Sequence, residues 1–111
     1  MIVGHIPLFS NFIEWRKGTA DGVPAQVQVV NAHEVAAVLE KYPVKLTLSG
    51  HLHVNETFFY KGITFANVGA VSGNWWKGIR DGFQEGYAML SFRGDEVGFE
   101  YVDYGWEVEE G

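Results

Sequence analysis

The chain of 111 residues is long enough for one domain, and its 47% apolar and 20% charged residues predict a folded core rather than a disordered chain. Acidic residues outnumber Lys and Arg by 14 to 8, and the basic residues are scattered along the sequence, so a nucleic-acid-binding surface is not expected. The absence of cysteine excludes disulfides and thiolate metal ligands.

Targeting signals are not expected. The first residues, Met1 to His5, do not combine a basic segment with an apolar stretch, as a signal peptide does. No apolar run approaches the ~18–20 residues of a membrane span, so no membrane association is expected. These features assign no compartment, and the localisation stays open.

The chain opens on an apolar stub, Met1 to Val3, that stops at Gly4. This pattern is typical of the end of a buried strand, so we expect a preceding part of the fold to be missing and residues 1–111 to form a single incomplete domain. Residues 8–24 mix apolar side chains with glycines and a proline, which indicates a surface loop with at most one short helical turn.

One main helix is predicted near residues 32–42. Asn31 and Glu34 have the spacing of a capping box, and Pro43 marks the end of the helix. Apolar residues lie between these signals at helical spacing: Val35, Val38, Leu39 and Tyr42.

Short apolar runs after the helix predict five strands. They cover residues 44–48, 56–60, 63–68, 87–92 and 97–102. Lys61-Gly62 and Gly94-Asp95 suit tight hairpin turns, and residues 69–85 indicate a long loop rich in glycine and aromatic residues. A strand stub, one helix and then mostly antiparallel strands indicate an α/β chain of α+β character.

Three histidines follow predicted strand ends. His5 comes after residues 1–3, and His51 and His53 come after residues 44–48; a glycine precedes both His5 and His51. Neutral imidazole is a good ligand for zinc, iron, manganese or nickel. The residues alone allow two interpretations equally: a metal site, or hydrogen-bonded turn histidines. His33, on the predicted helix, is expected to be a solvated surface residue.

Gly4-His5-Ile6-Pro7 and Gly50-His51-Leu52-His53, in this order, resemble the last two metal-ligand motifs of the calcineurin-like metallophosphoesterases. Residues 69–78, followed by Asp81-Gly82 and Gly86-Tyr87, are similar to the C-terminal region of a subgroup of these enzymes. The resemblance therefore covers nearly the whole chain. It implies the C-terminal half of a metallophosphoesterase β-sandwich flanked by helices.

The resemblance also implies a site for two divalent ions of Mn, Fe or Zn, in which His5 and His51 bind one ion and His53 binds the other. In the family, a hydroxide that bridges the two ions attacks phosphorus, and the substrates are phosphomonoesters or phosphodiesters. The expected partner is therefore a phosphate ester, bound once the site is complete.

The earlier motifs of the family, D-x-H, G-D-x-x-D and G-N-H, are absent from these 111 residues. In the family they supply the bridging carboxylate, an Asn ligand and the catalytic His. We therefore expect no catalytic residue in this chain and no phosphoesterase activity from this chain alone.

Two other interpretations remain open. The first is a truncated, non-catalytic product that folds by oligomerising, and the second is a small module in which the three histidines hold one ion. A half-sandwich leaves an apolar sheet face and open strand edges, which favour a homo-oligomer or association with the missing N-terminal half.

The aromatic loop contains the candidate substrate-binding residues. Trp75 and Trp76 are interpreted either as core packing beneath the loop or as the wall of a substrate pocket. In the second interpretation, Lys77 or Arg80 contacts a phosphate or another anion.

Overall fold

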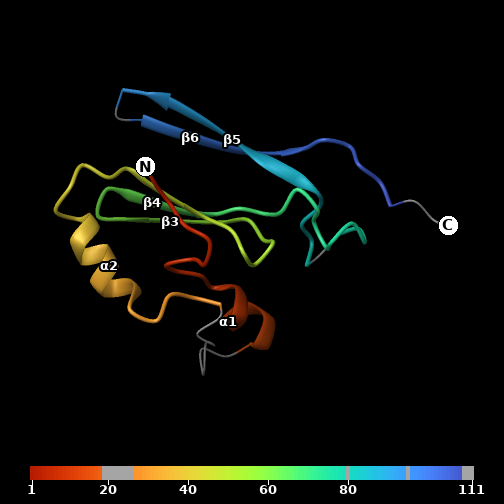
Figure 1. Ribbon diagram of the computed structural model, residues 1–111, viewed down its shortest axis with the longest axis horizontal. Coiled ribbons are helices and arrows are strands. Elements are labelled where there is room, and N and C mark those ends of the chain that lie inside the picture. Colours follow the sequence, from red (N-terminus) through yellow and green to blue (C-terminus); the bar gives the residue numbers. More distant parts are fainter. Residues whose placement is uncertain (19–26, 80, 95, 109–111) are drawn as a thin grey trace.

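The computed structural model describes residues 1–18, 27–79, 81–94 and 96–108, which form a mixed α/β fold with two sheets (Figure 1). Its elements are β1 (Ile2–Val3), α1 (Phe12–Lys17), α2 (Ala32–Leu39), β2 (Leu46–Ser49), β3 (Glu56–Tyr60), β4 (Ile63–Asn67), β5 (Gly86–Arg93) and β6 (Glu96–Asp103). Within the described part of the chain, no helix has both the length and the apolar content that a bilayer crossing requires.

The first sheet has four strands in the order β1-β2-β4-β3. β2 runs parallel to both β1 and β4, whereas β3 and β4 form the predicted antiparallel hairpin, with Lys61 and Gly62 at positive φ in its turn. The expectation of mostly antiparallel strands therefore holds for only two of the four pairings in the structure. The reason is that β3 turns back at the outer edge, so β4 returns beside β2 in the same direction.

Both helices lie on one face of this sheet (Figure 1). α2 and the loop after β1 contribute to one apolar cluster, in which Leu39, Ile63 and Phe65 are buried and Phe9 meets Phe65 edge to face at 5.1 Å. A second cluster lies near α1. Its buried members are Phe12, Leu52 and Val54.

The helices differ from the sequence prediction in two boundaries and in one capping bond. The segment predicted to hold at most one helical turn contains the six-residue α1, which ends where the Gly18 N–H bonds to the Glu14 carbonyl. α2 ends at Leu39 because residues 40–42 continue only as turns before Pro43, which disfavours helical backbone ahead of it. Asn31 occupies the N-cap position, but its side chain makes no capping bond.

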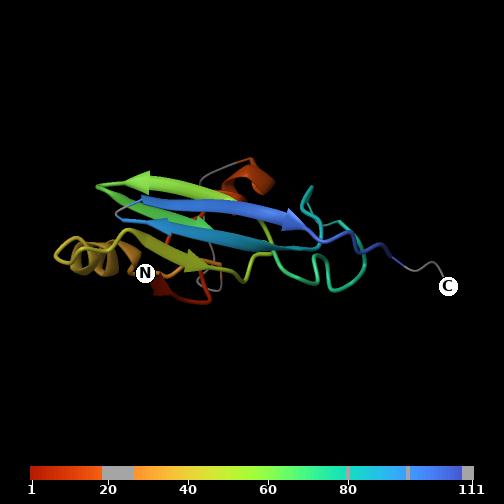
Figure 2. The same cartoon turned by 90° about the horizontal axis from the view of Figure 1, so that it is seen from above.

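The β5–β6 hairpin forms a second layer over the opposite face of the first sheet (Figures 1 and 2). No apolar side chain of β5 or β6 is fully buried, and a pocket of about 530 Å³ lies between Phe59 and Thr64 of the first sheet and Ser91 and Val97 of the hairpin. The two layers therefore do not interdigitate as the two sheets of a closed sandwich do.

A polar network fixes the loop that follows β1 to the sheet. The carboxylate of Glu56 accepts hydrogen bonds from Ser10 Oγ (2.7 Å), Asn11 N (2.9 Å) and Asn67 Nδ2 (2.9 Å). Asn67 Nδ2 also donates to the carbonyl of Phe9 at 2.8 Å, and both Ser10 and Asn67 are buried. Because Ser10, Asn11 and Asn67 all donate to Glu56, this side chain ties residues 10–11 to β3 and β4, and the Asn67–Phe9 bond adds residue 9.

We expect Glu56→Ala to lower the free energy of unfolding by about 2–3 kcal/mol, because several donors lose their acceptor at once. Urea denaturation followed by Trp fluorescence measures the loss. Glu100→Ala is the matched control, since Glu100 is exposed on β6, and it should change stability by less than about 0.5 kcal/mol. Equal losses in the two variants would contradict a linking role for Glu56.

Candidate metal centre

The parallel pairing of β1 and β2 brings His5 and His51 together. Both residues lie just beyond the carboxyl ends of neighbouring strands. Two backbone bonds hold the segments side by side at this point: Gly4 N donates to Leu48 O (2.9 Å), and Gly50 N donates to His5 O (3.0 Å). As a result, His5 Nε2 lies 3.0 Å from His51 Nδ1, and the two rings meet edge to face.

The distance between His5 Nε2 and His51 Nδ1 has two chemical interpretations. One imidazole can donate its N–H to the other. Alternatively, both nitrogens can face one ion, because two ligands at about 2.1 Å from a metal and at right angles to it lie about 3 Å apart. Both side chains are exposed, so an ion can reach them from solvent. The pair therefore fits two adjacent positions in the coordination shell of one transition metal ion.

His53 is held separately from this pair. Its Nδ1 donates to the carbonyl of Gly73 at 2.5 Å, and its ring is tilted by 37° against that of Trp75, with the centroids 4.5 Å apart. In the neutral ring this bond leaves the lone pair on Nε2, which is the arrangement that metal-binding histidines commonly adopt. His53 thus has one nitrogen available as a ligand.

The backbone of the turn that carries His51 and His53 is strained. Both residues have positive φ angles, 70° for His51 and 60° for His53. These lie in the left-handed region, which residues other than glycine rarely adopt. Leu52 between them is buried against Phe12 and Val54. Strain of this kind persists only where the surrounding structure fixes it, and it concentrates at functional sites.

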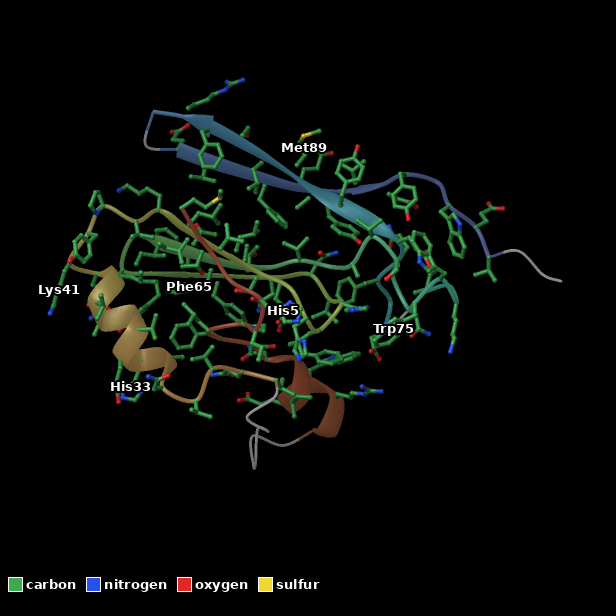
Figure 3. All side chains as sticks on the ribbon, viewed as in Figure 1. His5, His33, Lys41, Phe65, Trp75 and Met89 are labelled. Carbon is green, nitrogen blue, oxygen red and sulfur yellow. The ribbon has the colours of Figure 1, made fainter. Side chains whose placement is uncertain are left out.

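The three predicted ligands do not form one cluster. Among the described residues, no three His, Asp or Glu side chains lie close enough together to hold one ion. His33 lies on α2, away from His5 (Figure 3), and is exposed, as predicted from the sequence. The structure therefore brings His5 and His51 together and places His53 apart from them, against Gly73.

The predicted substrate-binding residues lie in residues 69–85, which we call the aromatic loop. Trp75 and Trp76 are 56% and 48% exposed, so neither is part of the core, and the interpretation as core packing is wrong for both. The ring of Trp76 lies 5.2 Å from that of Trp106, while Trp75 lies beside His53. Lys77 is exposed, and Arg80 lies outside the described residues.

Three residues that the sequence analysis missed support the aromatic loop. Asn55 Oδ1 accepts from Gly69 N at 2.8 Å, and Tyr101 OH donates to Gln84 O at 2.8 Å. A Cβ at Gly69 would come within 2.7 Å of the Tyr101 hydroxyl, so glycine is required there. Glu85 is buried against Gly73. The glycines were visible in the sequence, but their contacts depend on tertiary structure.

Comparisons with known proteins give no relative. No protein-family model, no curated protein and no solved structure matches this chain. The family resemblance therefore rests on the histidine motifs and on the similar C-terminal stretch, and a function has to be argued from the geometry of these residues.

The Tyr101 hydroxyl gives the aromatic loop a pH dependence. Its pKa is raised above the usual value of 10.0, first by burial and then by the nearby Tyr104, Glu85 and Asp103. Because the folded state favours the neutral hydroxyl, this contribution to stability is fully present below the unfolded pKa. It is lost as the pH rises through the higher folded pKa.

We therefore expect the free energy of unfolding to fall as the pH rises above about 10 in the unchanged protein, and to fall less steeply in Tyr101→Phe. Chemical denaturation at a series of pH values measures both slopes. Tyr101→Phe should be the less stable protein at neutral pH, because the bond to Gln84 O is lost. Identical alkaline slopes would show that Tyr101 does not carry the effect.

Proposed function

We propose that this chain supplies three metal-binding histidines to the two-ion centre of a phosphoesterase. In this proposal His5 and His51 bind one ion, and His53 binds the other. The observation that carries the proposal is the 3.0 Å separation of His5 Nε2 and His51 Nδ1 at the carboxyl ends of two parallel strands. This distance agrees with the division of ligands that the motif resemblance implies.

The bond from His53 to Gly73 O supports the second half of the proposal. It fixes the tautomer that leaves Nε2 as a ligand, while the position of the ring apart from His5 and His51 suits a neighbouring ion rather than the same one. Two ions about 3.5–4 Å apart would supply a nucleophile near neutral pH and neutralise charge on the phosphoryl oxygens.

The remaining roles fall to the aromatic loop. The ring of Trp75 lies tilted against that of His53 and is exposed, so it restricts the position of that imidazole and offers an apolar wall beside it. Lys77 follows in the same loop and, with Arg80, provides a cation for a phosphate group. The carboxylate and Asn ligands of the motif family have no counterpart in these 111 residues, so the proposed centre requires ligands from another polypeptide segment.

The proposal makes a specific prediction for metal binding, which isothermal titration with Zn²⁺ can measure. His5→Ala and His51→Ala should each weaken one binding event at least about tenfold, or about 1.4 kcal/mol, and the double variant should lose less than the sum of the two single losses. His33→Ala is the matched control, since this exposed histidine on α2 should leave binding unchanged.

His53→Ala separates the two-ion proposal from the module in which three histidines hold one ion. In the two-ion proposal, His53→Ala leaves the His5–His51 binding event unchanged. An equal loss of affinity in His5→Ala and His53→Ala would contradict the two-ion division and favour the one-ion module. Unchanged binding in all the variants would contradict both.

For activity, we expect no metal-dependent hydrolysis of p-nitrophenyl phosphate by this chain alone in the presence of Mn²⁺ or Zn²⁺. The physical reason is that the family's bridging carboxylate and catalytic His are absent from the sequence. Release of nitrophenolate measures the rate. Turnover that requires Mn²⁺ and disappears in His51→Ala would contradict this expectation.

A further inference from the structure

The outer edge of β5 is one of the two longest open strand edges in the described structure, with that of β6. β5 and β6 are eight residues each, and the described strands give β5 only one neighbour, β6. An isolated two-stranded hairpin is marginally stable in water, because its backbone groups are half unpaired and it has little apolar face to bury. This hairpin packs only loosely on the first sheet, so its stability needs a further contact.

β5 lacks the features that normally protect an edge strand. It contains no proline and no acidic residue, and its one basic residue, Arg93, stands at its end. Apolar side chains on it are exposed: Tyr87 by 40%, Met89 by 53% and Phe92 by 56%. A long strand without acidic residues and with exposed apolar side chains is suited to pairing with another strand.

The other open edges are less suited to pairing. β1 has two residues and β3 has five, and β3 begins with Glu56, which is occupied by its three hydrogen bonds. β6 carries three acidic residues, so pairing it with its own copy would bring like charges together. The acidic residues of β6 are Glu96, Glu100 and Asp103.

The β5 edge also borders an open part of the molecule. Seen from above, β5 lies on the β1 side of the hairpin, and β6 lies on the β3 side (Figure 2). A pocket of about 330 Å³ lies beneath β5, between Val3 and Leu48 of the first sheet and Tyr87 and Ala88 of the hairpin. A strand added to β5 would cover this pocket as well as the edge.

We propose that a second copy of this chain pairs with the β5 edge, so that two β5 strands run antiparallel about a two-fold axis and the two hairpins form one four-stranded sheet. The absence of acidic residues on β5 and the acidic character of β6 favour β5–β5 pairing over β6–β6 pairing. This inference concerns the hairpin and is independent of the metal centre.

The register follows from the length of the strand and its charges. A two-fold axis at Leu90 lets all residues from 87 to 93 pair, which places Met89 opposite Ser91 of the second copy. It also places Tyr87 opposite Arg93, which allows a cation–π contact across the interface. Ala88, Leu90 and Phe92 then share one face in both copies, because alternate residues of a strand point the same way.

Cysteine cross-linking tests both the edge and the register, because the chain has no cysteine of its own. We would mix Met89→Cys protein with Ser91→Cys protein under mild oxidation and separate the products by non-reducing electrophoresis. The proposed register puts these positions directly opposite each other, with Cβ atoms about 4.5–5.5 Å apart. Equal residues of the two copies lie on the diagonal, about 7–8 Å apart. We expect the mixture to form at least about ten times more disulfide dimer than either variant alone.

The matched control is a mixture of Glu100→Cys and Val102→Cys proteins, which places the same spacing on β6 and should cross-link no more than background.

Light scattering of the unchanged protein should give a dimer, and Leu90→Lys and Leu90→Glu should each be monomers that form a dimer when mixed. A monomeric unchanged protein overturns the proposal. So does a dimer that cross-links through the β6 pair rather than the β5 pair.

Discussion

The parallel pairing of β1 with β2 is the constraint on which the candidate metal centre depends. β1 has only two residues, yet its position decides where His5 lies relative to His51. The backbone bonds beyond the strand ends, from Gly4 N to Leu48 O and from Gly50 N to His5 O, extend the register past the sheet. A strand of two residues has too few hydrogen bonds to hold its position alone. The Glu56 network, which anchors residues 9–11, gives the same segment a second attachment.

The second ligand region depends on the hairpin instead. The aromatic loop runs from the end of the first sheet toward β5, and Tyr101 of β6 contacts Gly69 and the carbonyl of Gln84. His53 contacts this loop through a hydrogen bond to Gly73 O and through its ring contact with Trp75. The two halves of the proposed centre thus belong to different parts of the fold. His5 and His51 lie at the ends of strands of the first sheet, whereas His53 contacts the loop that leads to the hairpin layer, so loosening of the hairpin acts directly on His53.

The sequence predicted the local elements better than their arrangement. The strands at 56–60 and 63–68 and the hairpin near Gly94 were confirmed within one or two residues, because alternation and turn residues are local signals. The parallel placement of β4 beside β2 was missed, because no local pattern says which strand a hairpin returns to. The placement of His5 and His51 after strand ends was confirmed. The contact of His53 with Gly73 O was missed, because it joins residues twenty positions apart.

Leu52 links ligand geometry to the interior of the protein. It is buried between Phe12 and Val54, while the residues on either side of it, His51 and His53, hold strained backbone angles and project imidazoles to two different places. The two side chains therefore cannot adjust independently: a shift of Leu52 in its packing turns both rings at once. In the proposed metal centre, affinity for the ion would then fall when the interior near α1 loosens, even with every proposed ligand present.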